Sequence, residues 1–394
     1  MNKYIQDTIR NKSRSIIAGL SVPQQKAVNE MVRGLFTAGE PILRHLAQDE
    51  TKSAKKQAEK YSHHLGNISL QPKVEALALK EAASGIRKTT IIAYDLTDVN
   101  KELAEKMEKL SKVWDGSRKK VAPGFLLHGV GMNNILVKLE VHDSDTHTTN
   151  QIRRKIIETL SKKFEGKGIW VFDRGNDDKQ FFKFLRQEAK VSFIARLKEN
   201  RQVVLKETGV KIQVKDLEPG KYQIYLMQKY NVNVDESAVY TLIISKHLEE
   251  CEPIRLIHNL HFNFSMKKIV TMYLERWGVE NMFKRVKEKF GLERIRVLKY
   301  EKFVTLIALI QLVVLLSTLI FFRIQKSTHL LITGVLLYYR NFLKLKSLSF
   351  NLESFISFLK SSLKPFAFKN SAVPNQLTLF PQTHLQITSP PSLS

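Results

Sequence analysis

The spacing of apolar residues changes once along the chain, close to residue 89. Residues 1–88 show no strand pattern, and a stretch after Pro23 repeats apolar residues at helical spacing. These apolar residues are Val28, Met31, Val32, Leu35 and Phe36. After residue 89, short β-branched and aromatic runs alternate with helical patterns, which is typical of an α/β protein. The sequence therefore predicts a helical N-terminal region, 1–88, and then a mixed sheet with helices on its faces.

The pattern over residues 89–199 predicts three strands followed by a helix, a strand, a helix and a strand. The expected strands are 89–95, 124–129, 134–141, 168–173 and 191–197. The expected helices are 99–113, 150–165 and 179–189. A loop, Gly131-Met-Asn-Asn, is expected to join the second and third strands.

Residues 200–258 carry mostly alternating apolar positions, which predicts further strands. The expected strands are 202–206, 210–214, 222–228 and 238–245, with turns at Gly220 and Asn231. We interpret this tract as a β-rich insertion that interrupts the sheet before its next helix. The expected parts of the chain are 1–88, 89–199, 200–258, 259–350 and a C-terminal tail, 351–394, that is disordered at its end.

Two of the predicted strands end on an aspartate. The runs Thr89–Asp95 and Gly168–Asp173 are short and rich in apolar, β-branched or aromatic residues before the acidic residue. Each is therefore expected to deliver a carboxylate at the end of a buried strand.

Neighbouring acidic residues are alternative candidates for the roles of Asp95 and Asp173. Asp98 is an alternate for Asp95, although the two face opposite sides of an extended strand. Asp177 and Asp178 follow Asp173 closely, but they fit a loop or a first helical turn, where acidic residues complement the helix dipole.

A polar stripe occupies the predicted helix over residues 273–287. Tyr273, Arg276, Glu280 and Lys287 fall within a stripe about 60° wide when successive residues are placed about 100° apart. With Asp95 and Asp173, Glu280 would form an acidic triad. Carboxylates are the ligands that Mg²⁺ prefers, and two such ions can stabilise the attacking and leaving oxygens of phosphoryl transfer.

The chain here resembles the DDE transposases of bacterial insertion sequences, in the subgroup marked by the signature Y-x2-R-x3-E-x6-K. All four signature positions match, at Tyr273, Arg276, Glu280 and Lys287. The resemblance covers roughly residues 85–320 and includes the order of the two aspartates, an Asp-Arg-Gly at residues 173–175 and a strand-rich tract before the glutamate. The predicted element order is that of a ribonuclease H-like fold, and the resemblance implies the same fold.

The resemblance also implies the chemistry. It implies a DNA transposase that cuts and joins strands at insertion-sequence ends, with Asp95, Asp173 and Glu280 as catalytic residues and metal ligands. Two Mg²⁺ ions are the expected cofactors, and Mn²⁺ can replace them. The expected partners are double-stranded DNA, as terminal inverted repeats and target, and a second copy of the chain on that DNA; no small-molecule substrate is expected.

The roles of the remaining signature residues follow from their side chains. Arg276 and Lys287 are expected to bind DNA phosphate, the first through its planar fork and the second as a point charge. Tyr273 is expected to hydrogen-bond a phosphate oxygen, to stack on a displaced base, or simply to pack. For Trp277, packing against the sheet is the preferred interpretation.

Composition narrows the class of partner. The chain has 63 Lys and Arg against 38 Asp and Glu, a formal net charge of +25, which favours a polyanion such as nucleic acid or an anionic membrane surface. The basic stretch 52–60 indicates either a DNA-end-binding unit or a solvated helix face. One cysteine and the lack of a signal-peptide pattern predict a cytoplasmic, nucleoid-associated protein.

One segment leaves an alternative open. Residues 303–322 carry no charge and are long enough to span a membrane. We favour a helix buried in the core, because the acidic triad, whose Glu280 lies close to this segment in the sequence, must assemble in water. The alternatives to an active transposase are an inactive remnant that only binds DNA and a basic membrane-attached protein.

Overall fold

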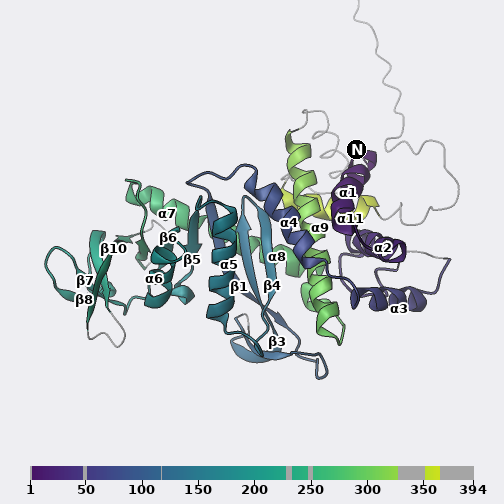
Figure 1. Cartoon of the computed structure of the whole chain (residues 1–394), viewed down its shortest axis with the longest axis horizontal. Helices are drawn as coiled ribbons and strands as arrows, with labels where there is room; N and C mark the ends of the chain where they lie inside the picture. The colour runs from purple at the N-terminus through teal and green to yellow at the C-terminus, as the bar shows by residue number, and fades with distance from the viewer. Residues whose placement is uncertain are drawn as a thin grey trace, which may run out of the picture.

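The computed structural model describes residues 2–47, 51–116, 118–227, 233–246, 252–326 and 351–363. These form a mixed α/β protein in which helices cover an 11-stranded sheet (Figure 1). The uncharged end of the chain, residues 370–394, lies outside the described residues. The α-helices are α1 (Asn2–Ile17), α2 (Val22–Ala38), α3 (Ala54–Leu65), α4 (Gln71–Ala83), α5 (Thr149–Lys163), α6 (Lys179–Gln187), α7 (Met266–Leu274), α8 (Trp277–Phe290), α9 (Tyr300–Lys326) and α11 (Leu352–Leu363).

The sheet has the order β2-β3-β1-β5-β6-β11-β10-β9-β7-β8, with β4 also paired to β3. The pairs β1–β5 and β5–β6 are parallel and the others antiparallel. The strands are β1 (Ile91–Asn100), β2 (Ser111–Asp115), β3 (Lys120–Met132), β4 (Ile135–Val141), β5 (Ile169–Phe172), β6 (Ser192–Arg196), β7 (Gln202–Leu205), β8 (Lys211–Gln213), β9 (Gly220–Met227), β10 (Val234–Ser245) and β11 (Ile254–His258).

The element order confirms the predicted fold class. The strands β1, β3 and β4 are antiparallel neighbours, and β5 and β6 then add in parallel after α5 and α6, which is the ribonuclease H-like arrangement. The tract between β6 and α7 forms β7 to β11, and these strands continue the same sheet beyond β6.

The predicted helix at 99–113 is wrong. β1 extends to Asn100, where it pairs with Gly124, and Ser111 begins a further strand that pairs with the same glycine. The apolar residues between them do repeat at helical spacing, but pairing with the long strand β3 holds both ends of the segment extended. The expected loop between β3 and β4 is also shorter than predicted: Asn133 and Asn134 both have positive φ, at 52° and 62°, as a two-residue hairpin turn requires.

Helix α8 packs against the sheet at unusually close range. It contacts β1 and β3, and a Cβ added at Gly129 of β3 would lie 2.2 Å from the ring of Phe283. On the other face of these strands, Tyr94 of β1 and His128 of β3 hydrogen-bond each other beneath α5. The two glycines Gly129 and Gly131 therefore let α8 approach the strand that carries Asp95.

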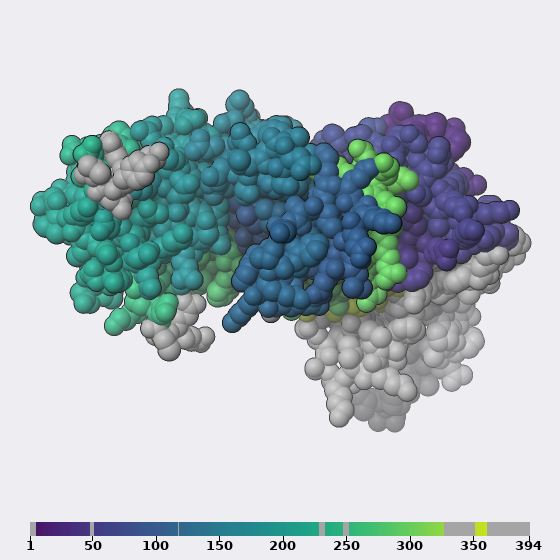
Figure 2. Space-filling view, turned by 90° about the horizontal axis from the view of Figure 1, so that it is seen from below, coloured from purple at the N-terminus to yellow at the C-terminus, as the bar shows by residue number. Residues whose placement is uncertain are grey.

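Helix α9 forms the core between the sheet and the N-terminal helices. It is the one described helix that is long and apolar enough to cross a membrane, but 89% of its most apolar 18-residue window is buried inside the protein. It contacts α1 to α4 and β4, and Figure 2 shows it as a green strip between the blue sheet segment and the purple N-terminal helices. The prediction of a buried helix is confirmed over the described residues.

Two polar side chains of α9 donate hydrogen bonds to backbone carbonyls in the core, although the buried Oε1 of Gln311 has no partner among the described residues. Gln311 is fully buried and donates to the carbonyls of Leu136 and Val137 in β4, at 3.0 and 3.2 Å. Thr305 donates to the carbonyls of Leu65 and Ile68. Because buried polar groups need such partners, these contacts fix the position of α9 against the sheet.

Candidate active site

Asp95 lies in the middle of β1 and not at its end. The parallel pairing of β1 with β5 ends at Ala93, whereas the antiparallel pairing with β3 continues through Asp95, which is opposite Gly129. The prediction that Asp95 ends its strand is therefore wrong. Asp95 does, however, lie just beyond the last residues of β1 that pair with β5. One of its oxygens, Oδ1, accepts the backbone N–H of Leu96 at 2.9 Å.

Asp173 directly follows β5, as predicted, and begins a 3₁₀ turn, η1 (Arg174–Asn176). Its Oδ1 accepts a hydrogen bond from the Asn176 side chain, which is only 4% exposed. Asn176 in turn accepts from Arg153 of α5 at 2.6 Å, and the Arg153 guanidinium lies 3.5 Å from the centre of the Phe181 ring. Arg153 and Asn176 thus hold Asp173 in place.

Neither Asn176 nor Arg153 was predicted from the sequence. Asn176 could have been noticed three residues after Asp173, the distance at which a short turn lets an amide reach back. Arg153 gave no signal, because its helix and β5 meet only in the folded protein.

The alternates to Asp173 have structural roles. Asp177 accepts two hydrogen bonds from the Arg201 side chain, at 2.7 and 2.9 Å, and one from the backbone of Lys198. Asp178 caps α6 by accepting from the backbone N–H of Phe181. Asp178 is therefore the N-cap residue immediately before α6 and not a residue of its first turn.

The predicted helix over 273–287 is two helices. Tyr273 belongs to α7, Arg276 precedes α8, and the backbone between them makes tighter bonds, from Arg276 to Tyr273 and from Val279 to Arg276. The backbone stays right-handed at Arg276, with φ −54° and ψ −34°. Arg276 and Glu280 therefore still lie one turn apart on the same side.

Arg276 joins two of the predicted ligands. Its Nη1 lies 2.9 Å from Oδ2 of Asp95 and 2.7 Å from Oε1 of Glu280. The Arg276 side chain is 9% exposed, whereas that of Glu280 is 48% exposed. The buried Nε of Arg276 has no hydrogen-bond partner among the described residues. Tyr273 is buried, with its ring centre 5.9 Å from the guanidinium.

The charges of these residues act on one another. Burial raises the pKa of Asp95 to about 7, the charge of Asp173 adds to this, Arg276 opposes it, and Glu280 raises it further. Burial also raises the pKa of Tyr273, and Asp173 adds to that effect. For Arg276, burial works against the charged form, but Tyr273, Asp95 and Glu280 outweigh it and raise the pKa. The three predicted carboxylates therefore share one electrostatic environment.

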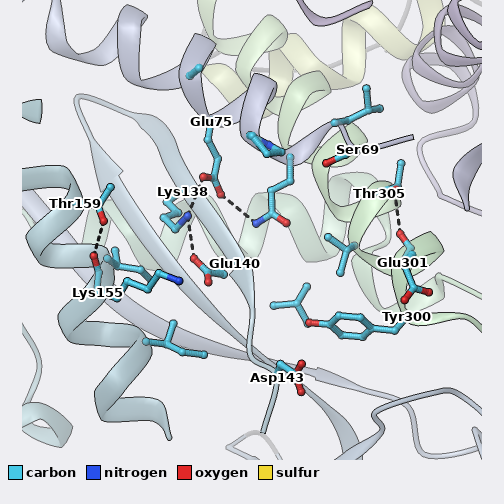
Figure 3. Close-up of a pocket in the computed structure, with 18 of the residues that line it drawn as sticks. Ser69, Glu75, Lys138, Glu140, Asp143, Lys155, Thr159, Tyr300, Glu301 and Thr305 are labelled. Atoms are coloured by element: carbon cyan, nitrogen blue, oxygen red, sulfur yellow. Dashed lines mark hydrogen bonds and ion pairs between the residues drawn. The ribbon is translucent and has the colours of Figure 1, made fainter. Parts of the chain in front are cut away.

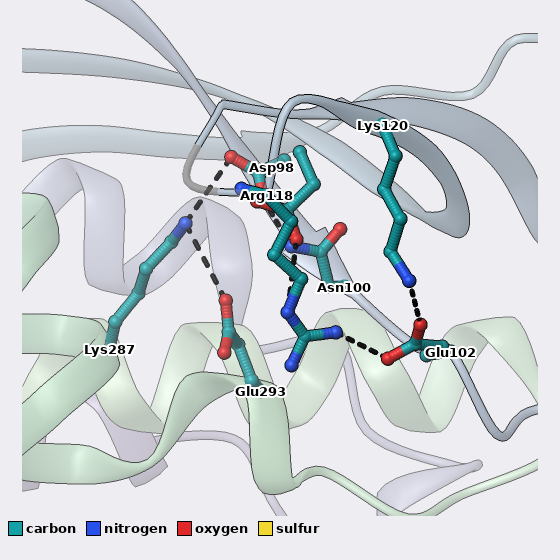
Figure 4. Close-up of polar contacts among 8 residues, drawn as sticks. Asp98, Asn100, Glu102, Arg118, Lys120, Lys287 and Glu293 are labelled. Carbon is teal, nitrogen blue, oxygen red and sulfur yellow. Dashed lines mark hydrogen bonds and ion pairs between the residues drawn. The ribbon is translucent and has the colours of Figure 1, made fainter.

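Lys287 lies apart from this group. Its Nζ is 3.4 Å from Oδ1 of Asp98 and 3.6 Å from Oε1 of Glu293 (Figure 4). Asp98 thus pairs with Lys287 and Asp95 with Arg276, so the two aspartates take part in separate ion pairs. Trp277, between Arg276 and Glu280, is 50% exposed, so its interpretation as a packing residue is wrong.

The donor atoms fit a hard divalent cation in chemistry and in charge. Three carboxylates repel one another around Asp95, and a cation relieves that repulsion while taking the oxygen ligands it prefers. As they stand, however, no three His, Cys, Asp or Glu side chains in the described ranges are grouped closely enough to hold an ion. The guanidinium of Arg276 contacts both Asp95 and Glu280 where such an ion would compete for them.

A separate cavity of about 990 Å³ lies between α4, α5, β4 and the start of α9 (Figure 3). Its charged lining is mixed: Lys138 bridges Glu75 and Glu140, each at 2.8 Å. None of the six predicted site residues lines it.

Comparison with known proteins gives the class. The Transposase DDE domain family matches residues 87–316, and the chain belongs to this family. The match begins just before β1 and ends within α9, so it contains all six predicted site residues. No curated protein matches.

One similar solved structure is described as "Cryo-EM structure of piggyBac transposase synaptic complex with hairpin DNA". It is 11% identical, with a TM-score of 0.49, over 92% of this chain and 77% of that chain. A transposase acts on DNA, so DNA is the polyanion that the net charge of +25 indicated.

Proposed function

We propose that this transposase cuts and joins DNA strands at insertion-sequence ends, with Asp95, Asp173 and Glu280 as its catalytic and metal-binding triad. The observation that carries the proposal is the contact of one buried guanidinium with Asp95 and Glu280, residues 185 positions apart in the chain. The charge of Asp173 also raises the pKa of Asp95, which supports its inclusion as the third carboxylate of the triad.

The three carboxylates would hold Mg²⁺, or Mn²⁺ in its place, as a pair of ions that supplies Lewis-acid activation of the attacking and leaving oxygens. Asp173 is the most fixed ligand, because Asn176 and Arg153 orient it. Glu280 is the most exposed of the three and can rotate. Arg276 must release Asp95 or Glu280 when the triad closes, and its guanidinium then becomes available to a DNA phosphate oxygen.

The other signature residues bind DNA around the reacting phosphate. Lys287 is about two helical turns from Glu280 on α8, beside Asp98, and would contact a neighbouring phosphate. Tyr273 is buried against Arg276 and keeps its phenol protonated, since burial raises its pKa; it can donate to a phosphate oxygen. Terminal inverted repeats and target DNA would be the substrates of a homodimer in a nucleoid-associated, cytoplasmic setting.

The test uses the full chain and a plasmid that carries the element's own flanking sequences. Asp95→Asn, Asp173→Asn and Glu280→Gln should each abolish Mg²⁺-dependent strand cleavage while leaving DNA affinity within about threefold, since charge neutralisation at a few positions changes few phosphate contacts. Cleavage at the wild-type rate in any variant removes that residue from the triad. A wild-type chain that binds this DNA but never cleaves it is an inactive remnant.

A further inference from the structure

The hairpin formed by β2 and β3 presents an uncovered apolar face. In its register Trp114 is opposite Val121 and Lys112 is opposite Pro123. Trp114 is 60% exposed and Val121 58% exposed, while their neighbours Val113 and Ala122 are buried on the other face. Large apolar side chains exposed side by side on a strand indicate a binding surface.

The same hairpin is strongly basic. Residues 111–124 contain four cations and a single acidic residue, Asp115, which is buried. The cations are Lys112, Arg118, Lys119 and Lys120, and all four are exposed. Arg118 and Lys120 both pair with Glu102, as Figure 4 shows. A tryptophan surrounded by lysine and arginine complements the sugar–phosphate surface of nucleic acid.

The hairpin is a continuation of the strand beside the candidate active site. Gly129 of β3 is opposite Asp95, and Val121 of the same strand is opposite Trp114. Eight residues of strand at about 3.3 Å each place Trp114 roughly 26 Å from Asp95 along β3, or about 8 base pairs of duplex at 3.4 Å per pair. Lys287 lies between them, beside Asp98 of β1.

The hairpin is also open to solvent. In Figure 2 the blue surface that contains β2 and β3 faces the viewer and is not covered by another coloured element. A two-stranded ribbon of this kind fits the major groove of B-DNA.

We propose that the β2–β3 hairpin is a DNA-binding element that holds the duplex about 8 base pairs from the reacting phosphate. Its cations contact backbone phosphates, and Trp114 and Val121 lie against sugars and base edges in the groove. The inference rests on the proposed function, because it assumes that DNA reaches the carboxylates; it adds a second point of attachment that fixes the direction of the duplex.

The experiment compares three full-length variants on a 40-base-pair duplex. Trp114→Ala should weaken binding about fivefold or more, the usual effect of removing an aromatic contact to nucleic acid. Lys112→Ala/Lys119→Ala should weaken it and lower the slope of log affinity against log salt by about 2. The matched control, Lys162→Ala/Lys163→Ala, removes two exposed lysines from the last turn of α5, which leads to the opposite end of the sheet, and should change the affinity much less.

A direct readout uses tryptophan fluorescence. The chain has three tryptophans, of which Trp170 is 1% exposed. In a Trp277→Phe background, acrylamide therefore quenches Trp114 almost alone, and duplex DNA should protect it.

The outcomes separate the two proposals. A wild-type chain that binds no DNA contradicts the proposed function itself. A chain that binds DNA with unprotected Trp114 and unchanged affinity in the hairpin variants overturns the hairpin assignment alone. A Trp114→Ala change that converts a dimer to a monomer without DNA also overturns it, because the face would then bind a second copy of the chain.

Discussion

At the scale of single residues, Arg276 determines the present arrangement of the candidate site. One nitrogen, Nη1, contacts both Asp95 and Glu280. Arg276 lowers the pKa of Asp95, but burial and the charge of Asp173 together still raise it above its ordinary value. The helical stripe predicted that Arg276 and Glu280 would be neighbours. It could not predict the contact with Asp95, which depends on how closely α8 approaches β1.

The raised pKa of Asp95 predicts a pH dependence of stability. Because the folded pKa of about 7 is above the ordinary 3.8, the folded protein keeps a proton that the unfolded chain releases, and the free energy of unfolding falls as the pH rises from about 4 to about 7. In metal-free buffer at pH 8, Asp95→Asn should therefore be more stable than wild type, by about 2 kcal/mol.

Urea denaturation at pH 5 and pH 8 measures this effect. The exposed Asp216 supplies the control, since Asp216→Asn should follow the wild-type profile. If Asp95→Asn loses as much stability between pH 5 and pH 8 as the wild type does, the pH dependence does not come from Asp95.

A second residue-scale prediction concerns the support of Asp173. Asn176→Ala removes the amide between Arg153 and Asp173, so cleavage should fall about 10- to 100-fold, as when the partner of a metal ligand is lost. The affinity for Mn²⁺, measured by calorimetry, should fall as well. Asn150→Ala is the matched control, because Asn150 accepts from the other Arg153 nitrogen at 2.9 Å but does not contact Asp173. If both substitutions lower cleavage equally, they act through the position of Arg153 and not through the support of Asp173.

At the scale of elements, the close contact between α8 and β3 sets the distance from Arg276 to Asp95. Gly129→Ala should push α8 outward, since the new Cβ would lie 2.2 Å from the Phe283 ring, and should destabilise the protein by about 1–3 kcal/mol. Gly85→Ala is the control, because a Cβ there meets nothing within 4 Å.

The double variant Gly129→Ala/Phe283→Leu tests whether the contact between the new methyl group and Phe283 causes the loss of stability. It should recover part of the stability and of the cleavage rate, because a smaller side chain on α8 leaves space for the new methyl group. If the stability and the cleavage rate of the double variant fall by the sum of the two single effects, the cause lies in the β3 backbone and not in the contact with Phe283.

The elements that the sequence predicted correctly are those with a local signal. Helix α5 has an N-terminal capping box, formed by Thr148 and Gln151, and β5 is a short apolar run that ends at Asp173. The segment 99–113 was predicted wrongly because its local spacing is helical while its pairing partner, β3, is distant in the chain. The break between α7 and α8 has no proline, and the one nearby glycine, Gly278, lies two residues after Arg276 and inside α8, so the sequence alone did not place the break.

At the scale of the whole molecule, α9 decides between a membrane protein and a protein with an unusually apolar core. Its residues are buried against the sheet and the N-terminal helices. The full chain should therefore remain in the supernatant after cell lysis at high salt, which also removes bound nucleic acid, followed by ultracentrifugation. Recovery only with detergent would favour the membrane alternative.

The glutamines along β4 have a consequence for assembly. Gln311 of α9 and Gln71 of α4 donate to the carbonyls of Leu136, Val137 and Leu139, so side chains occupy acceptors that a further strand would need. An unoccupied edge invites strand addition and fibril growth, and this edge is closed from within. Joining two copies of the chain here into one continuous sheet would displace these glutamines, so we expect a pair of chains on DNA to meet at another surface.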